Sequence, residues 1–171
     1  MRSLLVLALV LSTPVSAQAL KGFNTNAPVD FSADRIEVQD RAGRVVVSGN
    51  AKVQQGGLSL DASRMTIAYT GAVGGSPTVQ RIDASGGVFV RSATENARGD
   101  IAIYDVNRRL ITMLGGVTLT QGANTVRGGR LVIDLNSGRS VIDGSSVGGG
   151  PGVSGGGGRV TGRFSVPQRT N

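Results

Sequence analysis

The sequence contains no cysteine, histidine or tryptophan, and its only aromatic residues are four phenylalanines and two tyrosines. Without cysteine no disulfide can form, so buried apolar side chains and strand pairing must hold the fold together. Histidine is the commonest catalytic base, and histidine and cysteine are the commonest ligands of transition metals. We therefore expect no enzymatic activity, no catalytic residue, no metal site and no cofactor.

The chain has a net charge of +7, and of its 18 basic residues all but Lys21 and Lys52 are arginine. A basic balance favours anionic partners such as nucleic acid, phosphorylated lipid or anionic polysaccharide. The arginines are dispersed singly, and so few aromatic rings cannot supply the stacking surface that single-stranded nucleic acid needs. We therefore expect no nucleic-acid partner, and a solvated outer face for most of the arginines.

Residues 1–19 have the pattern of a secretory signal peptide. Arg2 supplies the positive charge, residues 4–11 form an apolar stretch too short to span a bilayer, and small residues fit cleavage after Ala17 or Ala19. We expect an exported, periplasmic protein with a short leader at residues 20–27; an uncleaved anchor is the alternative. Residues 145–171 are rich in glycine and are predicted to form a disordered tail, because they cannot bury enough apolar surface to fold alone.

Between these segments, small residues and glycines recur at fixed intervals. They are Ala33, Ala62, Gly99 and Gly128, alternating with Gly49, Gly86, Gly115 and Gly144. The step from small residue to glycine is 16 positions in three copies (33 to 49, 99 to 115, 128 to 144), and the step to the next small residue is always 13 (49 to 62, 86 to 99, 115 to 128). The exception, 62 to 86, contains an insertion at residues 70–77. A period of about 29 residues with one strand pair per copy indicates a β-repeat architecture.

Around each central glycine, every second residue is apolar, as in a strand with one buried face. In the first copy the inward set is Val45, Val47, Gly49, Ala51 and Val53. The inward parity changes at each small residue, which a β-bulge or strand corner would produce. In the third copy the alternation places Ala102 and Tyr104 inside although Ile101 and Ile103 are more apolar, and we follow the alternation. The fourth copy keeps only part of the pattern.

The strands can bury these faces by closing into an elongated, twisted roll of two facing sheets. We therefore predict an all-β fold over residues 28–144. The inward residues are mostly small or medium in size, with few rings to fill the centre. A packed core usually recruits more large side chains, so we expect the slot between the sheets to be left partly open for an apolar ligand.

Segments 49–56, 97–105 and 115–124 resemble signature segments of the OstA-like family of lipopolysaccharide transport proteins, and residues 28–35 resemble the mature start of its periplasmic member. The similarity covers residues 28–144. It implies an open β-jellyroll whose copies stack head to tail as a homo-oligomer. Such a stack bridges inner-membrane and outer-membrane transport components that have similar β-jellyroll domains, and it carries the acyl chains of lipopolysaccharide, or of a related anionic glycolipid, inside the roll.

On this reading the inward residues line an apolar, lipid-binding groove. The candidates are Ile36, Val38, Val47, Ala51, Val53, Leu58, Leu60, Met65, Ile67, Val88, Val90, Tyr104, Met113, Val117, Leu119, Leu131 and Ile133. Each of them is equally well explained as an ordinary core residue, because a residue that lines a groove can both pack in the core and contact a lipid.

Two other functions fit parts of the pattern. A self-assembling structural protein, such as an adhesin without lipid cargo, would share the exposed terminal strands but would have a sealed core. An exported enzyme acting on polysaccharide would need paired carboxylates. Its candidates Asp83, Asp100, Asp105 and Asp134 fall at strand ends and turns, where aspartate is common for backbone reasons.

Overall fold

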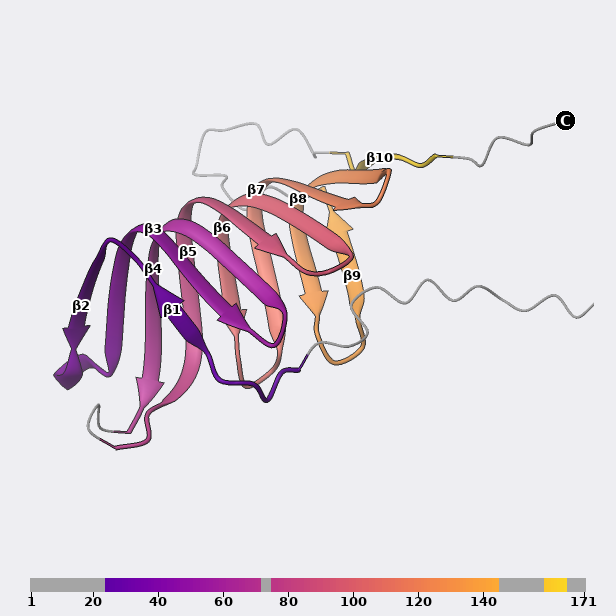
Figure 1. Cartoon of the computed structure of the whole chain (residues 1–171). Helices are drawn as coiled ribbons and strands as arrows, with labels where there is room; N and C mark the ends of the chain where they lie inside the picture. Colours follow the sequence, from indigo (N-terminus) through magenta and orange to yellow (C-terminus); the bar gives the residue numbers. More distant parts are fainter. Residues whose placement is uncertain (1–23, 72–74, 145–158, 166–171) are drawn as a thin grey trace, which may run out of the picture.

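The computed structural model describes residues 24–71, 75–144 and 159–165, which form one antiparallel sheet bent over on itself (Figure 1). The predicted signal peptide, residues 20–23 of the leader and residues 145–158 and 166–171 of the tail lie outside the described residues. The strands are β1 (Asp30–Ser32), β2 (Arg35–Gln39), β3 (Arg44–Gln55), β4 (Leu58–Thr70), β5 (Thr78–Arg91), β6 (Glu95–Asp105), β7 (Leu110–Gln121), β8 (Asn124–Asp134), β9 (Arg139–Asp143) and β10 (Thr161–Arg163). A 3-10 helix, η1 (Asp40–Ala42), joins β2 to β3.

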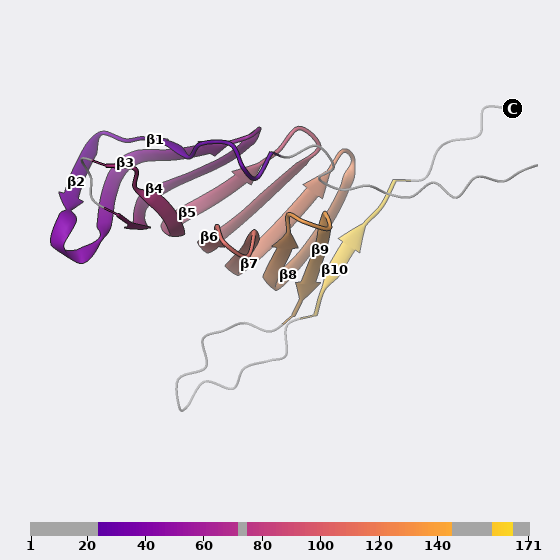
Figure 2. The same ribbon diagram turned by 90° about the horizontal axis from the view of Figure 1, so that it is seen from below.

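The long strands β3 to β8 each contribute to two layers. Layer A consists of β1, β10 and the segments 51–55, 58–62, 88–91, 95–98, 117–121 and 124–128 between them. Layer B consists of β2, β9 and the segments 44–48, 64–70, 78–85, 101–105, 110–114 and 130–134. The strands therefore run in chain order along an elongated roll, which Figure 2 shows from below. The predicted all-β, two-layered roll is confirmed.

Each long strand passes from one layer to the other at a bend, where the register shifts as the sequence predicted. The central glycines of the first three copies, Gly49, Gly86 and Gly115, lie at these bends and have positive φ of 74°, 86° and 81°. In these copies the residue after the small residue packs against the central glycine of the neighbouring strand. The amide of Asp34 donates to the Gly49 carbonyl at 2.8 Å, and the Ser63 hydroxyl donates to the Gly86 carbonyl at 2.6 Å. The fixed spacing in the sequence thus pairs a bend in one strand with a bend in the next.

The hairpin turns lie at the ends of the strand segments away from the bends. Turns 56–57, 92–94 and 122–123 belong to layer A, and turns 40–43, 106–109 and 135–138 belong to layer B. We call the boundary between these two rows of turns the seam. The insertion predicted at residues 70–77 falls between the layer B segments of β4, which ends at Thr70, and β5, which begins at Thr78, and its residues 72–74 lie outside the described residues.

One apolar cluster fills the space between the layers. It includes Val47, Met65, Ile82, Ile111, Met113 and Leu131, which are fully buried. The alternation is confirmed in the third copy, where Ala102 and Tyr104 are buried and Ile101 is 44 % exposed. At roughly 25 cal/mol per Å² of apolar area removed from water, this cluster is the main source of stability in a chain without disulfides.

Two expectations at the C-terminal end need correction. Residues 161–163, which lie in the tail expected to be disordered, form β10 and pair with β8 at the open edge of layer A. Gly144 follows the last residue of β9 instead of lying within a strand. For β10 the edge of the sheet decides, because this short strand finds backbone groups on β8 that β7 does not pair.

Candidate functional site

The residues predicted to line a groove all come from strands of the roll. All but Ile36, Val38 and Leu119 are buried within the cluster between the layers. Leu119 is half-buried and packs against that cluster. The structure therefore brings these residues together on one continuous inner surface that runs from β2 to β9.

Between the strands that the structure describes, the expected open slot is not present in this conformation. The cavity in the interior has a volume of about 10 Å³, which is about the space of one water molecule. Fully buried side chains of both layers fill the centre: Met65, Ile82, Tyr104 and Met113 come from layer B, and Leu60, Val88 and Val117 come from layer A. A hydrocarbon chain can enter only if the two layers separate.

Ile36 and Val38 differ from the other candidates because they are 49 % and 52 % exposed. They pair with Val47 and Val45 on β3, so they lie on the same inner side of layer B as the buried core. β2 is the last strand of this layer, and layer A opposite it ends at the short strand β1. The inner apolar surface is thus open to solvent at the β2 end of the roll.

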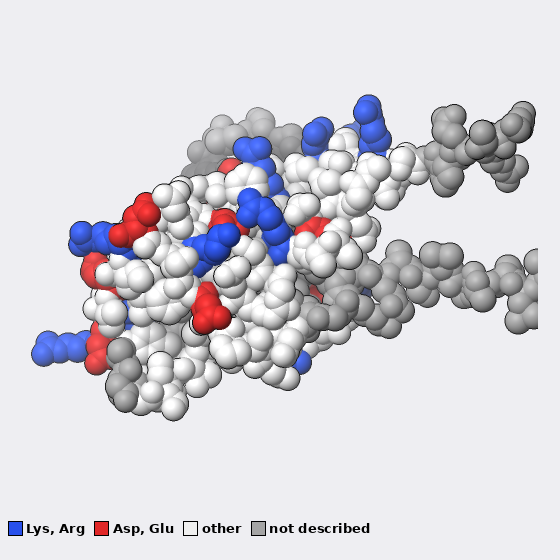
Figure 3. Space-filling view, in the orientation of Figure 1, with Lys and Arg blue, Asp and Glu red and all other residues white. Residues whose placement is uncertain are grey.

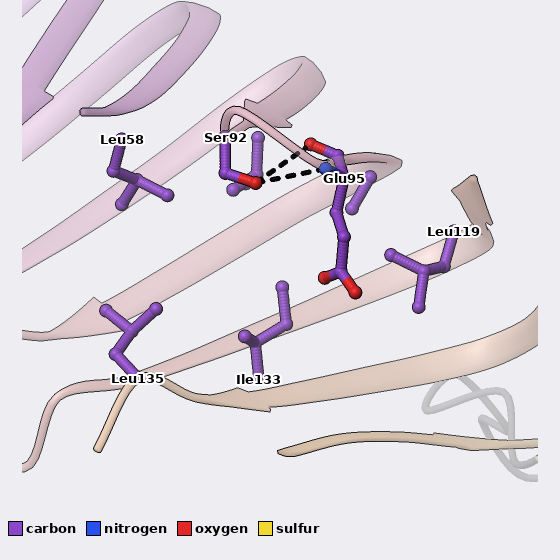
Figure 4. Close-up of a pocket in the computed structure, with 8 residues that line it drawn as sticks. Leu58, Ser92, Glu95, Leu119, Ile133 and Leu135 are labelled. Atoms are coloured by element: carbon purple, nitrogen blue, oxygen red, sulfur yellow. Dashed lines mark hydrogen bonds between the residues drawn. The ribbon is translucent and has the colours of Figure 1, made fainter. Parts of the chain in front are cut away.

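The small cavity lies at the seam. Leu58, Val90, Ser92, Glu95, Ala97 and Leu119 line it from layer A, and Ile133 and Leu135 line it from layer B and its turn (Figure 4). The Glu95 carboxyl group points into this cavity, toward Ile133 and Leu119. Glu95 is 5 % exposed, and its Oε2 atom has no hydrogen-bond partner among the described residues. Desolvation raises the pKa of its carboxyl group.

A second polar residue of the inner surface, Gln55, has a full set of partners. Its Oε1 atom accepts a hydrogen bond of 2.6 Å from the Tyr104 hydroxyl of layer B, so this bond joins the two layers. Burial raises the pKa of Tyr104 to about 12, which keeps the hydroxyl a donor at neutral pH. The Nε2 atom of Gln55 donates to the carbonyl oxygens of Thr25 and Ala27.

Residues 24–28, which we call the strap, extend these contacts across the seam. Gln55 of layer A holds Thr25 and Ala27 at 3.1 and 3.0 Å, and Arg109 in a turn of layer B donates to Asn26 at 2.9 Å. The strap thus connects the two layers across the seam. In the sequence, Gln55 and Glu95 stand two positions from the inward residues Val53 and Ala97, so the alternation of side chains places both on the inner face. Neither was predicted as a site residue, because the prediction used apolar residues only.

The outer surface of layer A carries a group of charges around Phe89. Asp61 forms ion pairs with Lys52 at 3.3 Å and Arg91 at 2.5 Å, and Arg91 and Arg98 lie over the Phe89 ring. Figure 3 shows basic side chains spread among acidic and neutral ones on this view of the molecule. Arg91 and Arg98 are therefore held on this surface by a local ion pair and by contacts with the Phe89 ring.

The described part of the chain has no helix that is long and apolar enough to cross a membrane. In the same residues, no three acidic, histidine or cysteine side chains are grouped as a metal ion would require. Of the four aspartates considered for an enzyme, Asp105 and Asp134 bond to their own turns, and Asp83 pairs with Arg81. These contacts give the aspartates structural roles in their strands and turns.

Comparison with known proteins identifies a family that matches most of this fold. Residues 30–139 match the family model of the LptA/LptD N-terminal domain lipopolysaccharide transport proteins. An uncharacterized protein of Rhizobium meliloti (strain 1021) is 31 % identical over 142 residues, which cover 80 % of this chain and 75 % of the relative.

A solved structure has the same fold. LptH from Pseudomonas aeruginosa is described as the LptA homologous periplasmic component of the conserved lipopolysaccharide transport device. It matches with a TM-score of 0.69 and 18 % sequence identity, over 83 % of this chain and 98 % of that chain. The bent, two-layered sheet is therefore an architecture already known from a solved protein.

Proposed function

Because the chain belongs to the family of LptA and LptD N-terminal domain lipopolysaccharide transport proteins, we propose that it is a non-enzymatic periplasmic carrier of lipopolysaccharide or a similar anionic glycolipid. Its acyl chains would lie against the inner surface of the roll while the head group stays in water. The observation that carries the proposal is the continuous apolar inner surface, which is exposed at Ile36 and Val38.

The physical need for such a carrier is large. Burial of a methylene group is worth about 0.8 kcal/mol, so exposing a fourteen-carbon chain to water costs on the order of 10 kcal/mol. An aqueous compartment is thus a barrier that a glycolipid with several chains does not cross unaided. A roll whose layers separate at the seam would offer these chains the apolar side chains that now contact one another.

The proposal includes assembly into a bridge. Copies would add head to tail, with the β1 and β2 end of one copy against the β9 and β10 end of the next, and the terminal copies would meet transport components with similar domains. In the part of the chain that the structure describes, both ends of the roll finish in edge strands, and edge strands are templates for such pairing.

A second candidate is a self-assembling structural protein without lipid cargo. The filled interior favours it, because a sealed core is what that function requires. Family membership and the exposed inner surface at β2 favour the carrier. The two functions differ in whether the inner residues ever contact lipid.

Photocrosslinking in cells tests this difference. A diazirine-bearing amino acid is placed at Ile36 or Leu119 on the inner surface, and at Ile101 as the control. Ile101 is 44 % exposed against 49 % for Ile36 and has the same side chain, but it lies on the outer face. We expect lipopolysaccharide adducts from Ile36 and Leu119 and none from Ile101. Adducts absent from both inner sites, or equally strong from Ile101, would favour the structural protein.

A further inference from the structure

Glu95 is a buried acidic group in an apolar cavity at the seam. The side chains around it are Leu58, Val90, Ala97, Leu119, Ile133 and Leu135. The Oε2 atom is buried and has no hydrogen-bond partner, whereas buried polar atoms in proteins are nearly always paired. Such an exception calls for a partner that the isolated chain does not supply.

The local turn does not explain the carboxyl group. Turn 92–94 is closed by the amide of Ser92 bonded to the Glu95 carbonyl at 2.9 Å, and by the Glu95 amide bonded to the Ser92 hydroxyl at 3.1 Å. All of these bonds use the backbone of Glu95, and Figure 4 shows the side chain extending away from them. A shorter or apolar side chain would leave the turn intact.

A structural water is also a poor explanation. A buried water usually makes about three hydrogen bonds, and the cavity of about 10 Å³ offers only Glu95 and Ser92 as polar side chains. The Ser92 hydroxyl is already engaged by the amides of Thr94 and Glu95. One carboxyl oxygen alone cannot hold a water molecule in an apolar cavity.

The position of Glu95 indicates where its partner comes from. The carboxyl group points away from turn 92–94 of layer A toward Ile133 of layer B, and Leu135, which begins turn 135–138 of layer B, lines the same cavity. This is the boundary at which the layers would separate to admit a chain. Gln55 also lies on the inner face of layer A, but its side chain already bonds to Tyr104 and the strap. Gln55 is therefore not available as a partner for Glu95 at the seam.

We propose that the Glu95 carboxyl group binds a hydrogen-bond donor, a hydroxyl or an amide N–H, on the proximal part of a hydrocarbon chain that enters the seam. This inference rests on the proposed function and refines it. The apolar neighbours would contact the chain on either side of the donor. Glu95 would thus select amphiphiles whose chains carry such a group over those with plain hydrocarbon.

The test uses the purified chain and two neutral esters that differ by one hydroxyl group, methyl 3-hydroxydodecanoate and methyl dodecanoate. The protein is incubated with an equimolar mixture, separated from free ester by gel filtration, and the bound esters are quantified by mass spectrometry. Wild type is compared with Glu95→Leu, Glu95→Gln and the control Gln121→Leu. Gln121 pairs with Glu95 across the strands and is half-buried, so it reports the loss of a neighbouring polar group.

We expect wild type and Gln121→Leu to retain about tenfold more hydroxylated than plain ester. Glu95→Leu should bind both esters equally, and Glu95→Gln should keep part of the preference because its amide oxygen still accepts. Equal binding of both esters by wild type, or an unchanged preference in Glu95→Leu, would overturn the inference and leave the carrier function standing. Binding of neither ester by wild type would overturn both.

Discussion

Glu95 and Gln55 occupy the same inner row of layer A next to the seam, yet their side chains are in opposite situations. Gln55 has three hydrogen bonds, one of them to the other layer, whereas Oε2 of Glu95 has none. A buried hydrogen-bonded group stabilises a fold modestly, and a buried group without a partner destabilises it. The two positions therefore allow the same substitution to be compared in two environments.

We predict that replacement by leucine has opposite effects at these positions. Glu95→Leu should raise the free energy of unfolding by about 1–2 kcal/mol at neutral pH, because it removes an unpaired carboxyl group from an apolar cavity. Gln55→Leu should lower it by about 1–3 kcal/mol, because the Tyr104 hydroxyl loses its acceptor. Urea unfolding measures both, and a loss of stability in Glu95→Leu would show that the carboxyl group has an unrecognised structural partner.

The pH dependence of stability gives a second prediction for Glu95. Desolvation raises its pKa in the folded state above the usual 4.5. The folded chain therefore holds this proton more tightly than the unfolded chain, so the contribution of Glu95 is complete below the unfolded pKa and is lost as the pH rises through the folded pKa. The stability of wild type relative to Glu95→Gln should fall as the pH rises above the usual carboxyl pKa and through the raised pKa of the folded state. All other titrating groups are shared, so a constant difference would contradict this.

The bends depend on glycine in a way that the neighbouring strands explain. At Gly115, φ is 81° and an added Cβ would lie 2.8 Å from the Cβ of Asp100. At the next residue, Gly116, φ is also positive, at 53°, but an added Cβ would meet no atom within 4 Å. The first glycine of the pair is therefore required by both conformation and packing, and the second by conformation alone.

We accordingly predict that Gly115→Ala is more destabilising than Gly116→Ala. A left-handed conformation costs a non-glycine residue about 1–2 kcal/mol, which is the whole effect expected at Gly116. At Gly115 the contact with Asp100 adds to this strain, for a total of about 3 kcal/mol or more. Thermal unfolding of the two variants measures the difference. Equal losses would mean that the bend at Asp100 shifts freely to make room.

The strands and their bends were predictable because both follow from local pattern. Side chains alternate with a period of two, and this placed Tyr104 inside and Ile101 outside although their polarity suggests the reverse. The filled interior was not predictable, because the closeness of two layers depends on how side chains far apart in sequence interlock. The bond between Tyr104 and Gln55 joins positions 49 residues apart, and the pairing of β10 with β8 depends on a vacant sheet edge.

The two ends of the roll are not equivalent. At the β2 end, Ile36 and Val38 expose the inner surface, whereas at the β9 end Ile142 is half-buried and packs against the core. A contact between unlike ends is heterologous, so it does not close after two copies and can continue along a line. Exposed apolar groups on the inner side of an edge strand would be covered by the next copy, and this would make the inner surface continuous between copies.

The last prediction follows from this asymmetry. We expect sedimentation velocity of wild type at rising concentration to show species that grow without a fixed upper size. The double variant Ile36→Lys with Val38→Lys should weaken this association, because two charges would have to be buried at the contact. Ile101→Lys is the matched control, since it places the same charge on an equally exposed isoleucine of the outer face. A closed dimer, or equal weakening by Ile101→Lys, would mean that copies associate through another surface and that the inner walls of successive rolls are not joined at β2.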